Sequence, residues 1–156
     1  MILITLALTE CQPKNTANVT EKDKTAITEW NDTCLTMVRN LNRDNAETFV
    51  EYTYSEDAIL FPPNVKSING REAIIAFYQN YPPMSDFSQE IKEMEVFGDY
   101  AYLRLNYSLP INQPVLNSYI DTGVIFCIMR KQNDGNWKIW REIWNSDMSV
   151  SNTPTL

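Results

Sequence analysis

The sequence predicts an α+β domain in which helices come first and a curved, mainly antiparallel sheet follows. In the first half of the chain, apolar residues recur every three or four positions, which is the period of an amphipathic helix. In the second half the period changes to two, and turn residues separate the segments, as is typical of antiparallel strands. Helices that precede a run of strands favour a layer of helices on one sheet over alternating βαβ units.

Three segments carry the helical pattern. The apolar residues of the first are Ile27, Trp30, Cys34, Val38 and Leu41. This helix is predicted to start within residues 20–25 and to end near Asn42. A second helix follows a cap at Asp44 or Asn45, and a third spans residues 71–81.

The predicted strands are residues 58–61, 88–97, 100–109, 118–131 and 137–145. Pro62 stops the first strand, and turns at Gly98 and at residues 133–135 join later ones. The segment 118–131 contains a continuous apolar run at residues 124–129, so we expect both of its faces to be covered.

Composition limits the partners. The chain has 156 residues, the usual size of one domain, which we assign to residues 26–148, followed by a polar tail at 149–156. A net charge of −7 disfavours nucleic acid, because like charges repel. The chain has no histidine, and Cys11, Cys34 and Cys127 lack the spacing of a zinc site, so we expect no metal and no cofactor. The two later cysteines are expected to be buried free thiols; a disulfide between them is the alternative.

The first 25 residues differ from the rest. Residues 1–8 are apolar, Cys11 follows, and residues 12–25 are polar. This arrangement is similar to a bacterial lipoprotein signal, in which a lipid is attached to the cysteine after cleavage. On that interpretation Cys11 is lipidated, residues 12–25 form a tether, and the protein works outside the cytoplasm with a lipid anchor in a membrane. The alternative is a frayed tail on a cytoplasmic protein.

Short motifs within residues 26–148 carry a resemblance to a known family. They are YSEDA (54–58), FPPN (61–64), GREAI (70–74), FY (77–78), GDYA (98–101), DTG (121–123), DGNWKI (134–139) and IWNSD (143–147). In this order and spacing they resemble the NTF2-like superfamily and, within it, the SnoaL-like and DUF4440-type domains. The resemblance implies a cone in which three helices close a curved sheet around an apolar cavity. It also implies a homodimer formed through the sheet.

The superfamily includes ketosteroid isomerases, cyclases, dehydratases and members without a known reaction. The isomerase needs a carboxylate base, a tyrosine donor and a protonated acid. Counted from the motifs, these positions fall on Phe61 or Pro62, near Thr36, and within residues 125–127. None of these residues supplies the required group, so we expect that isomerase chemistry to be absent.

The aromatic residues of the family's pocket are better preserved. Tyr54, Tyr78 and Trp144 match pocket-lining positions of the family. Phe61 is expected to line the pocket as well. Trp30, on the first helix, fits the pocket wall and the core equally well.

One carboxylate stands out on the last strand. Because side chains alternate along a strand, Trp140, Glu142 and Trp144 are predicted to share the face toward the cavity. Burial between two tryptophans would raise the pKa of Glu142, which favours general acid–base work near neutral pH. Such a group also suits a cationic or hydroxyl-bearing ligand. The alternatives are an ion pair with Arg104 or an outward orientation after a one-residue slip of register.

Three functions follow. The first is binding of a small lipophilic or aromatic molecule without catalysis. The second is an isomerase, dehydratase or cyclase step that uses Glu142 or Asp121, although Asp121 could instead cap its strand or pair with Arg104. The third is an association domain that dimerises through the sheet and binds no ligand.

Overall fold

The computed structural model describes residues 16–111 and 118–148. Cys11, the apolar residues 1–8 and the tail 149–156 lie outside the described residues, so their predicted roles stay predictions. Within the described ranges, no helix combines the length and the apolar character that crossing a membrane requires.

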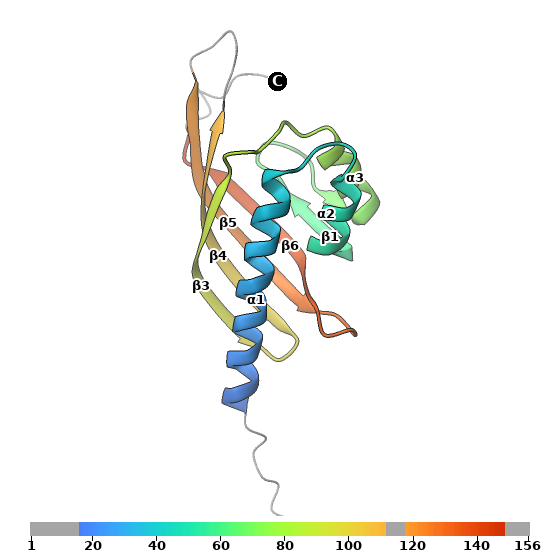
Figure 1. The fold of residues 1–156 in the computed structure, drawn as a ribbon, viewed down its shortest axis with the longest axis vertical. Helices are drawn as coiled ribbons and strands as arrows, with labels where there is room; N and C mark the ends of the chain where they lie inside the picture. The colour runs from blue at the N-terminus through green and yellow to red at the C-terminus, as the bar shows by residue number, and fades with distance from the viewer. Residues whose placement is uncertain (1–15, 112–117, 149–156) are drawn as a thin grey trace, which may run out of the picture.

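The predicted α+β class is confirmed. The helices are α1 (Thr16–Arg39), α2 (Ala46–Thr53) and α3 (Arg71–Gln79). The strands are β1 (Tyr54–Phe61), β2 (Ile68–Asn69), β3 (Ser88–Phe97), β4 (Tyr100–Ile111), β5 (Tyr119–Lys131) and β6 (Trp137–Ser146). Figure 1 shows α1 lying along the sheet and α2 and α3 gathered beside β1.

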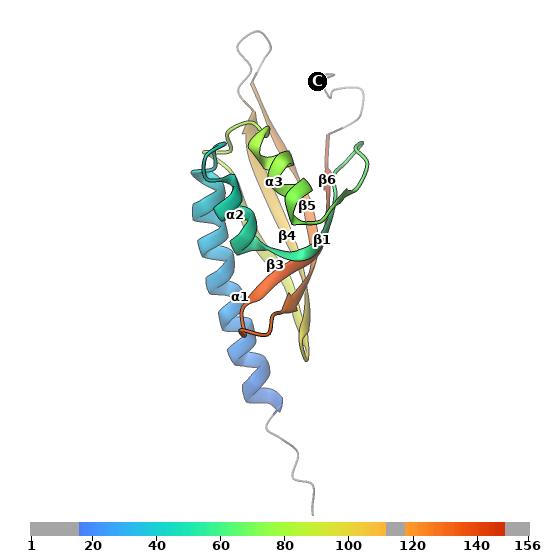
Figure 2. The ribbon, with the colours of Figure 1, turned by 90° about the vertical axis from the view of Figure 1, so that its right-hand side faces the viewer.

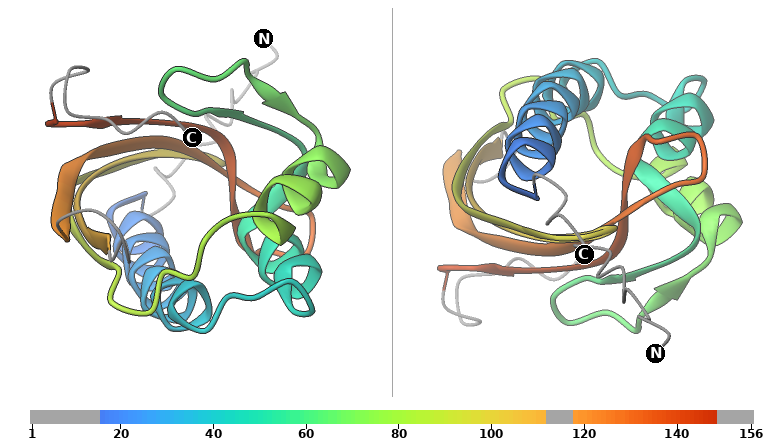
Figure 3. Two further views of the ribbon diagram at one scale, coloured as in Figure 1. Left: turned by 90° about the horizontal axis from the view of Figure 1, so that it is seen from above. Right: turned by 90° about the horizontal axis from the view of Figure 1, so that it is seen from below.

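The strands form one curved sheet in the order β2-β1-β6-β5-β4-β3. Neighbouring strands are antiparallel except β1 and β6, which run parallel because the chain passes through α3 and the meander β3–β5 before it returns beside β1. Seen from the side in Figure 2, the helices lie on one face of this sheet. Seen along the long axis in Figure 3, the sheet curves around α1, and α2 and α3 close the remaining side.

The first helix starts earlier than predicted, so the expected tether is wrong for residues 16–25, which belong to α1. The polar composition of this segment hid one buried side chain. Asp23 is 7% exposed, lies 2.5 Å from Nζ of Lys131 and accepts a hydrogen bond from Nε1 of Trp137 at 3.4 Å. These contacts fasten the N-terminal part of α1 to the β5–β6 hairpin, and Ile27, which is fully buried, continues the packed face.

Several strand boundaries also differ from the predicted ones. The first strand begins at Tyr54 instead of residue 58, and the predicted turn at Asn69-Gly70 includes the short strand β2. The fourth strand continues through Pro110 to Ile111. Because β3 begins opposite Ser108, β4 is an edge strand at that point, where a proline is tolerated.

The prediction that the long apolar strand is covered on both faces is wrong for the described residues. Cys127 and Met129 are buried on the inner face of β5, whereas Phe126 on the outer face is 39% exposed. The outer apolar side chains pack on one another instead: the Phe126 ring stacks on Tyr102 at 5.6 Å. The apolar run therefore reflects a core face and a separate aromatic surface.

Candidate functional site

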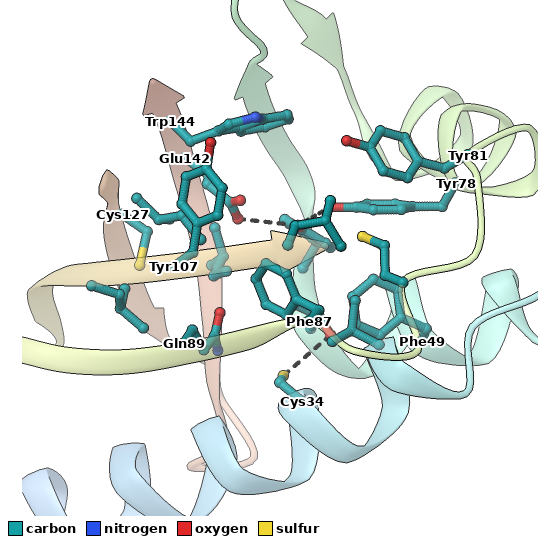
Figure 4. A pocket seen from close by; sticks show the side chains of 18 of the residues that line it. Cys34, Phe49, Tyr78, Tyr81, Phe87, Gln89, Tyr107, Cys127, Glu142 and Trp144 are labelled. Carbon is teal, nitrogen blue, oxygen red and sulfur yellow. Dashed lines mark hydrogen bonds between the residues drawn. The ribbon is translucent and has the colours of Figure 1, made fainter. Parts of the chain in front are cut away.

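A cavity of about 100 Å³ lies between the concave face of the sheet and the three helices (Figure 4). Of the described residues that line it, nine are aromatic, two are acidic and none is Lys or Arg. The full set is Trp30, Cys34, Val38, Phe49, Thr53, Tyr54, Phe77, Tyr78, Tyr81, Met84, Phe87, Gln89, Leu105, Tyr107, Leu109, Asp121, Ile125, Cys127, Ile139, Glu142 and Trp144. The cavity is thus apolar with a small number of polar groups, as small-molecule sites usually are.

A β-bulge decides which side chains of β6 reach this cavity. Between Ile139 and Arg141 the pairing with β5 shifts by one residue, so Trp140 is an extra residue in β6. Ile139, before the bulge, and Glu142 and Trp144, after it, line the cavity. The prediction that Trp140 shares their face is wrong, because simple alternation does not hold across a bulge.

Trp140 lies on the outer face of the sheet instead. Its Nε1 donates a hydrogen bond to Oδ2 of Asp57 at 3.0 Å. The guanidinium of Arg141 lies over its ring at 3.8 Å, and Arg130 pairs with Asp57 beside it. The tryptophan therefore has a structural role that joins β1, β5 and β6.

Glu142 is the most deeply buried carboxylate of the site, with 7% of its surface exposed. The hydroxyl of Tyr54 donates a hydrogen bond to its Oε2 at 3.0 Å, and the Tyr54 and Tyr78 hydroxyls lie 2.8 Å apart. No hydrogen bond to Oε1 is found among the described residues. Burial raises the pKa of Glu142 to about 7, and the hydrogen bond from Tyr54 acts in the opposite direction.

The two tyrosines are held in place by the fold. Tyr54 ends α2 and begins β1, and its carbonyl accepts a hydrogen bond from Nη2 of Arg71 at 3.2 Å. Tyr78 belongs to α3 and faces Glu142 across the cavity in Figure 4. Burial raises the pKa of both phenols well above 10, so they remain neutral donors at ordinary pH.

The buried cysteines Cys34 and Cys127 are free, as predicted. Burial raises the pKa of the Cys34 thiol to about 12, and its Sγ lies 3.3 Å from Oγ1 of Thr53. Burial also raises the pKa of Cys127. Both are therefore neutral thiols and poor nucleophiles. In residues 16–111 and 118–148 no group of three or more His, Cys, Asp or Glu side chains could hold a metal ion.

Asp121 also lines the cavity, and two hydroxyls hold its carboxylate. Tyr107 donates a hydrogen bond to Oδ2 at 3.0 Å, and Ser146 donates one to Oδ1. Gly123 makes this arrangement possible, because a Cβ there would lie 2.8 Å from the Tyr107 ring and 1.9 Å from the carbonyl oxygen of Asn145. The predicted alternative of a pair with Arg104 is not observed for either acid.

Arg104 is occupied elsewhere, on the outer face of the sheet. Its Nη2 lies 2.9 Å from Oε1 of Glu93.

The other predicted residues divide into two groups. Trp30, Tyr54, Tyr78 and Trp144 line the cavity as expected. Phe61 does not: it is 41% exposed on the outer face of β1, because Leu60 takes the inward position beside it.

The positions counted for the isomerase chemistry are placed as follows. Ile125 and Cys127 line the cavity, whereas Thr36 is not among the lining residues and donates its hydroxyl to the carbonyl of Asp32 within α1.

Several lining residues were missed by the sequence analysis. Tyr107 follows the alternation of Leu103 and Leu105 on β4, so strand periodicity could have found it. Tyr81 and Phe87 lie in the connection after α3. Tyr81 falls three residues after Tyr78 within the helix predicted over 71–81, so helical periodicity could have found it, whereas Phe87 has no periodic signal. They reach the cavity only because that connection crosses its wall.

Glu142 makes a testable contribution to stability. An acid whose pKa is about 7 when folded and 4.5 when unfolded favours folding less as pH rises from about 4.5 to 7, and the loss is complete above that range. Between pH 5 and pH 8 the free energy of unfolding of Glu142→Gln, measured with urea, is therefore expected to rise by about 2.5 kcal/mol relative to that of the wild type. The exposed Glu56→Gln serves as the control, and parallel curves for Glu142→Gln and wild type would contradict the burial argument.

Comparison with known proteins agrees with this geometry. The model of the SnoaL-like domain matches residues 35–126, more than half of the chain. None of the curated proteins compared with the chain matches it. Similar solved structures include a ketosteroid isomerase-like protein from Erwinia carotovora atroseptica, at 19% identity and a TM-score of 0.68, covering 80% of this chain and 96% of that one.

A second similar structure is an NTF2-like protein with a cystatin-like fold from Novosphingobium aromaticivorans. It has 18% identity and a TM-score of 0.65, and the match covers 83% of this chain and 86% of that one. At such identities the likeness shows the fold alone. Together with the family match, it establishes that the chain belongs to the SnoaL-like domain family and has the NTF2-like fold.

Proposed function

We propose that the protein binds a small lipophilic or aromatic molecule in this cavity, with Glu142 as the polar anchor. The observation that carries the proposal is a buried carboxylate in a mainly aromatic and aliphatic wall, with only one of its oxygens hydrogen-bonded among the described residues. Burying a carboxylate without enough partners costs free energy, so a fold that keeps one there has a use for it. A ligand that contacts Oε1 would supply the missing partner.

Pre-organisation supports the same conclusion. The anchor is fixed by Tyr54, which Arg71 and Tyr78 hold in turn. The aromatic wall is rigid as well: Phe49 and Tyr78 pack edge to face at 5.1 Å, and Phe77 and Tyr78 at 5.2 Å. A site of this kind loses little conformational freedom when a ligand enters, which favours binding.

Filling the cavity should abolish binding. Native mass spectrometry of the full chain is expected to show an additional non-covalent mass that disappears on denaturation. Ile125→Phe, which extends into the cavity, is expected to remove that mass. Val124→Phe, one residue away on the outer face of β5, is expected to keep it. A wild-type protein that carries nothing and binds no member of a lipophilic panel would contradict the proposal.

A catalytic version of the same site is the second candidate. The observation that favours it is the raised pKa of Glu142, about 7, because a group with that pKa both accepts and donates protons near neutral pH. Tyr54 is a neutral donor beside it. Asp121 is the second carboxylate, but Tyr107 and Ser146 already hold both of its oxygens.

Substitution of Glu142 separates catalysis from binding. If the bound molecule is converted, Glu142→Gln is expected to lower kcat by roughly 10²–10⁴-fold, the usual contribution of a general acid or base, while binding stays measurable. Asp121→Asn, in the same cavity, is the matched comparison. Turnover that survives in Glu142→Gln and falls in Asp121→Asn would transfer the role to Asp121, and turnover unchanged in both would exclude these two acids.

We also propose that two copies associate through the outer face of the sheet. Phe61, Ile143 and Phe126 are direct neighbours across β1, β6 and β5, and they are 41%, 52% and 39% exposed. Burying such a row removes apolar surface from water, which favours association. If no ligand is found, this association is the remaining candidate function.

A lysine in that row should separate the copies. By size-exclusion chromatography with light scattering, the wild type is expected at twice the monomer mass and Phe126→Lys at the monomer mass. Tyr52→Lys on α2, where the aromatic side chain is similarly exposed at 37%, is the matched control and should stay dimeric. A wild-type protein that is monomeric at tens of micromolar would refute the proposal.

A further inference from the structure

We infer that the molecule bound in this cavity is a small organic cation, an ammonium group on a frame no larger than a single six-membered ring. The inference rests on the proposed function, that the cavity binds a small molecule, and narrows its ligand class. It draws on three properties of the lining: its charge, its aromatic content and its size.

The charge of the lining excludes anions. The acidic side chains Glu142 and Asp121 contribute to the wall, and no lysine or arginine of the described residues does. A carboxylate or phosphate ligand would enter an apolar site next to acidic groups without a counter-ion, which is strongly unfavourable. The net charge of −7 on the whole chain adds a long-range field that repels anions and attracts cations.

The aromatic wall favours a cation over a neutral molecule of the same shape. Nine aromatic residues surround the cavity, and ring faces attract ammonium groups most strongly where water is excluded. A carboxylate at the same site provides the charge-assisted hydrogen bond. Aromatic cages are a recognised solution for binding quaternary ammonium ligands in proteins.

None of the described groups that face Glu142 carries a positive charge, so a cationic ligand would be the partner for its negative charge. From β1 and α3 they are the phenols of Tyr54 and Tyr78, and from α1 and β5 the thiols of Cys34 and Cys127. Burial raises the pKa of all four of these groups, so they are neutral at ordinary pH. The wall also contains the phenols of Tyr81 and Tyr107, whose pKa burial raises, and the carboxylate of Asp121, which is itself acidic.

Size sets the upper limit of the ligand. An apolar cavity of about 150 Å³ holds one benzene molecule. The cavity here is about 100 Å³, so a single ring or a small alkylammonium ion fits inside after slight adjustment of the wall, whereas a multi-ring molecule would extend beyond it. This argues against a steroid-sized ligand for this chain.

Three probes that differ mainly in charge test the inference: benzylammonium, benzyl alcohol and benzoate. Isothermal titration of the full chain at pH 8 is expected to show benzylammonium binding about tenfold or more tightly than benzyl alcohol, and no binding of benzoate. Benzylammonium affinity is expected to be about tenfold weaker at pH 6 than at pH 8, because Glu142, with a pKa of about 7, becomes neutral. Benzyl alcohol should show no such change.

Variants assign the preference to one residue. In Glu142→Gln, benzylammonium should lose its advantage over benzyl alcohol and its pH dependence. Benzyl alcohol, whose hydroxyl can still donate to the amide oxygen of the glutamine, should keep a measurable affinity and so report an intact cavity. Glu56→Gln makes the same change on the exposed edge of β1 and should behave as the wild type.

Two results would overturn the inference in different ways. Equal or tighter binding of benzyl alcohol would reject the cation but leave a binding cavity. It would direct attention to Nε1 of Trp30, a buried donor without a hydrogen-bond partner among the described residues. Failure of all three probes, together with no additional mass in native mass spectrometry, would reject both this inference and the proposed function.

Discussion

The site depends on the extra residue that Trp140 adds to β6. Without the bulge, strict alternation from Ile139 would place Glu142 on the outer face, among charged side chains and in water. With it, Glu142 enters the cavity, and Trp140 turns outward to bond Asp57 and carry Arg141 on its ring. The contacts of Trp140 on the outer face therefore stabilise the strand register that places Glu142 on the inner face. Bulges frequently re-aim side chains beside functional sites in this way.

Two opposing effects set the pKa of the buried Glu142 carboxylate. Removal from water disfavours the charged form of Glu142, whereas the Tyr54 hydroxyl favours it, and the first effect is larger. Tyr78 extends the hydrogen-bonded chain but adds no charge. Any group that enters the cavity and contacts Oε1 acts on this balance directly. The protonation of Glu142 and the occupancy of the cavity are consequently linked properties.

The sequence predicted the fold well because period-two and period-3.6 patterns are local, and β3 matches its predicted bounds, residues 88–97. It failed where a distant contact overrides local composition. Asp23 looked like part of a polar tether, but Lys131 and Trp137, more than a hundred positions away, bury it in a packed helix. The inward position of Glu142 was predicted correctly. The reasoning behind it was incomplete, because the same strand alternation also predicted an inward Trp140, which lies on the outer face. A bulge has no reliable signature in a single sequence. The pattern could therefore predict that Glu142 faces the cavity, but not which side chains lie beside it.

The two acidic residues of the cavity differ in their hydrogen bonds, and the difference indicates which of them would gain most from contact with a ligand. Asp121 accepts hydrogen bonds from Tyr107 and Ser146, one on each oxygen, and Gly123 leaves the space for the first of them. Glu142, more deeply buried, has a single donor within residues 16–111 and 118–148. A carboxylate with both oxygens satisfied gains little from a further partner, whereas one with a free oxygen in apolar surroundings gains a great deal. Because a ligand that binds the folded state stabilises it, a partner for Glu142 would also offset the free energy that its burial costs. The Glu142 carboxylate, whose burial lowers the stability of the ligand-free protein, is thus the group through which a ligand would stabilise the fold most.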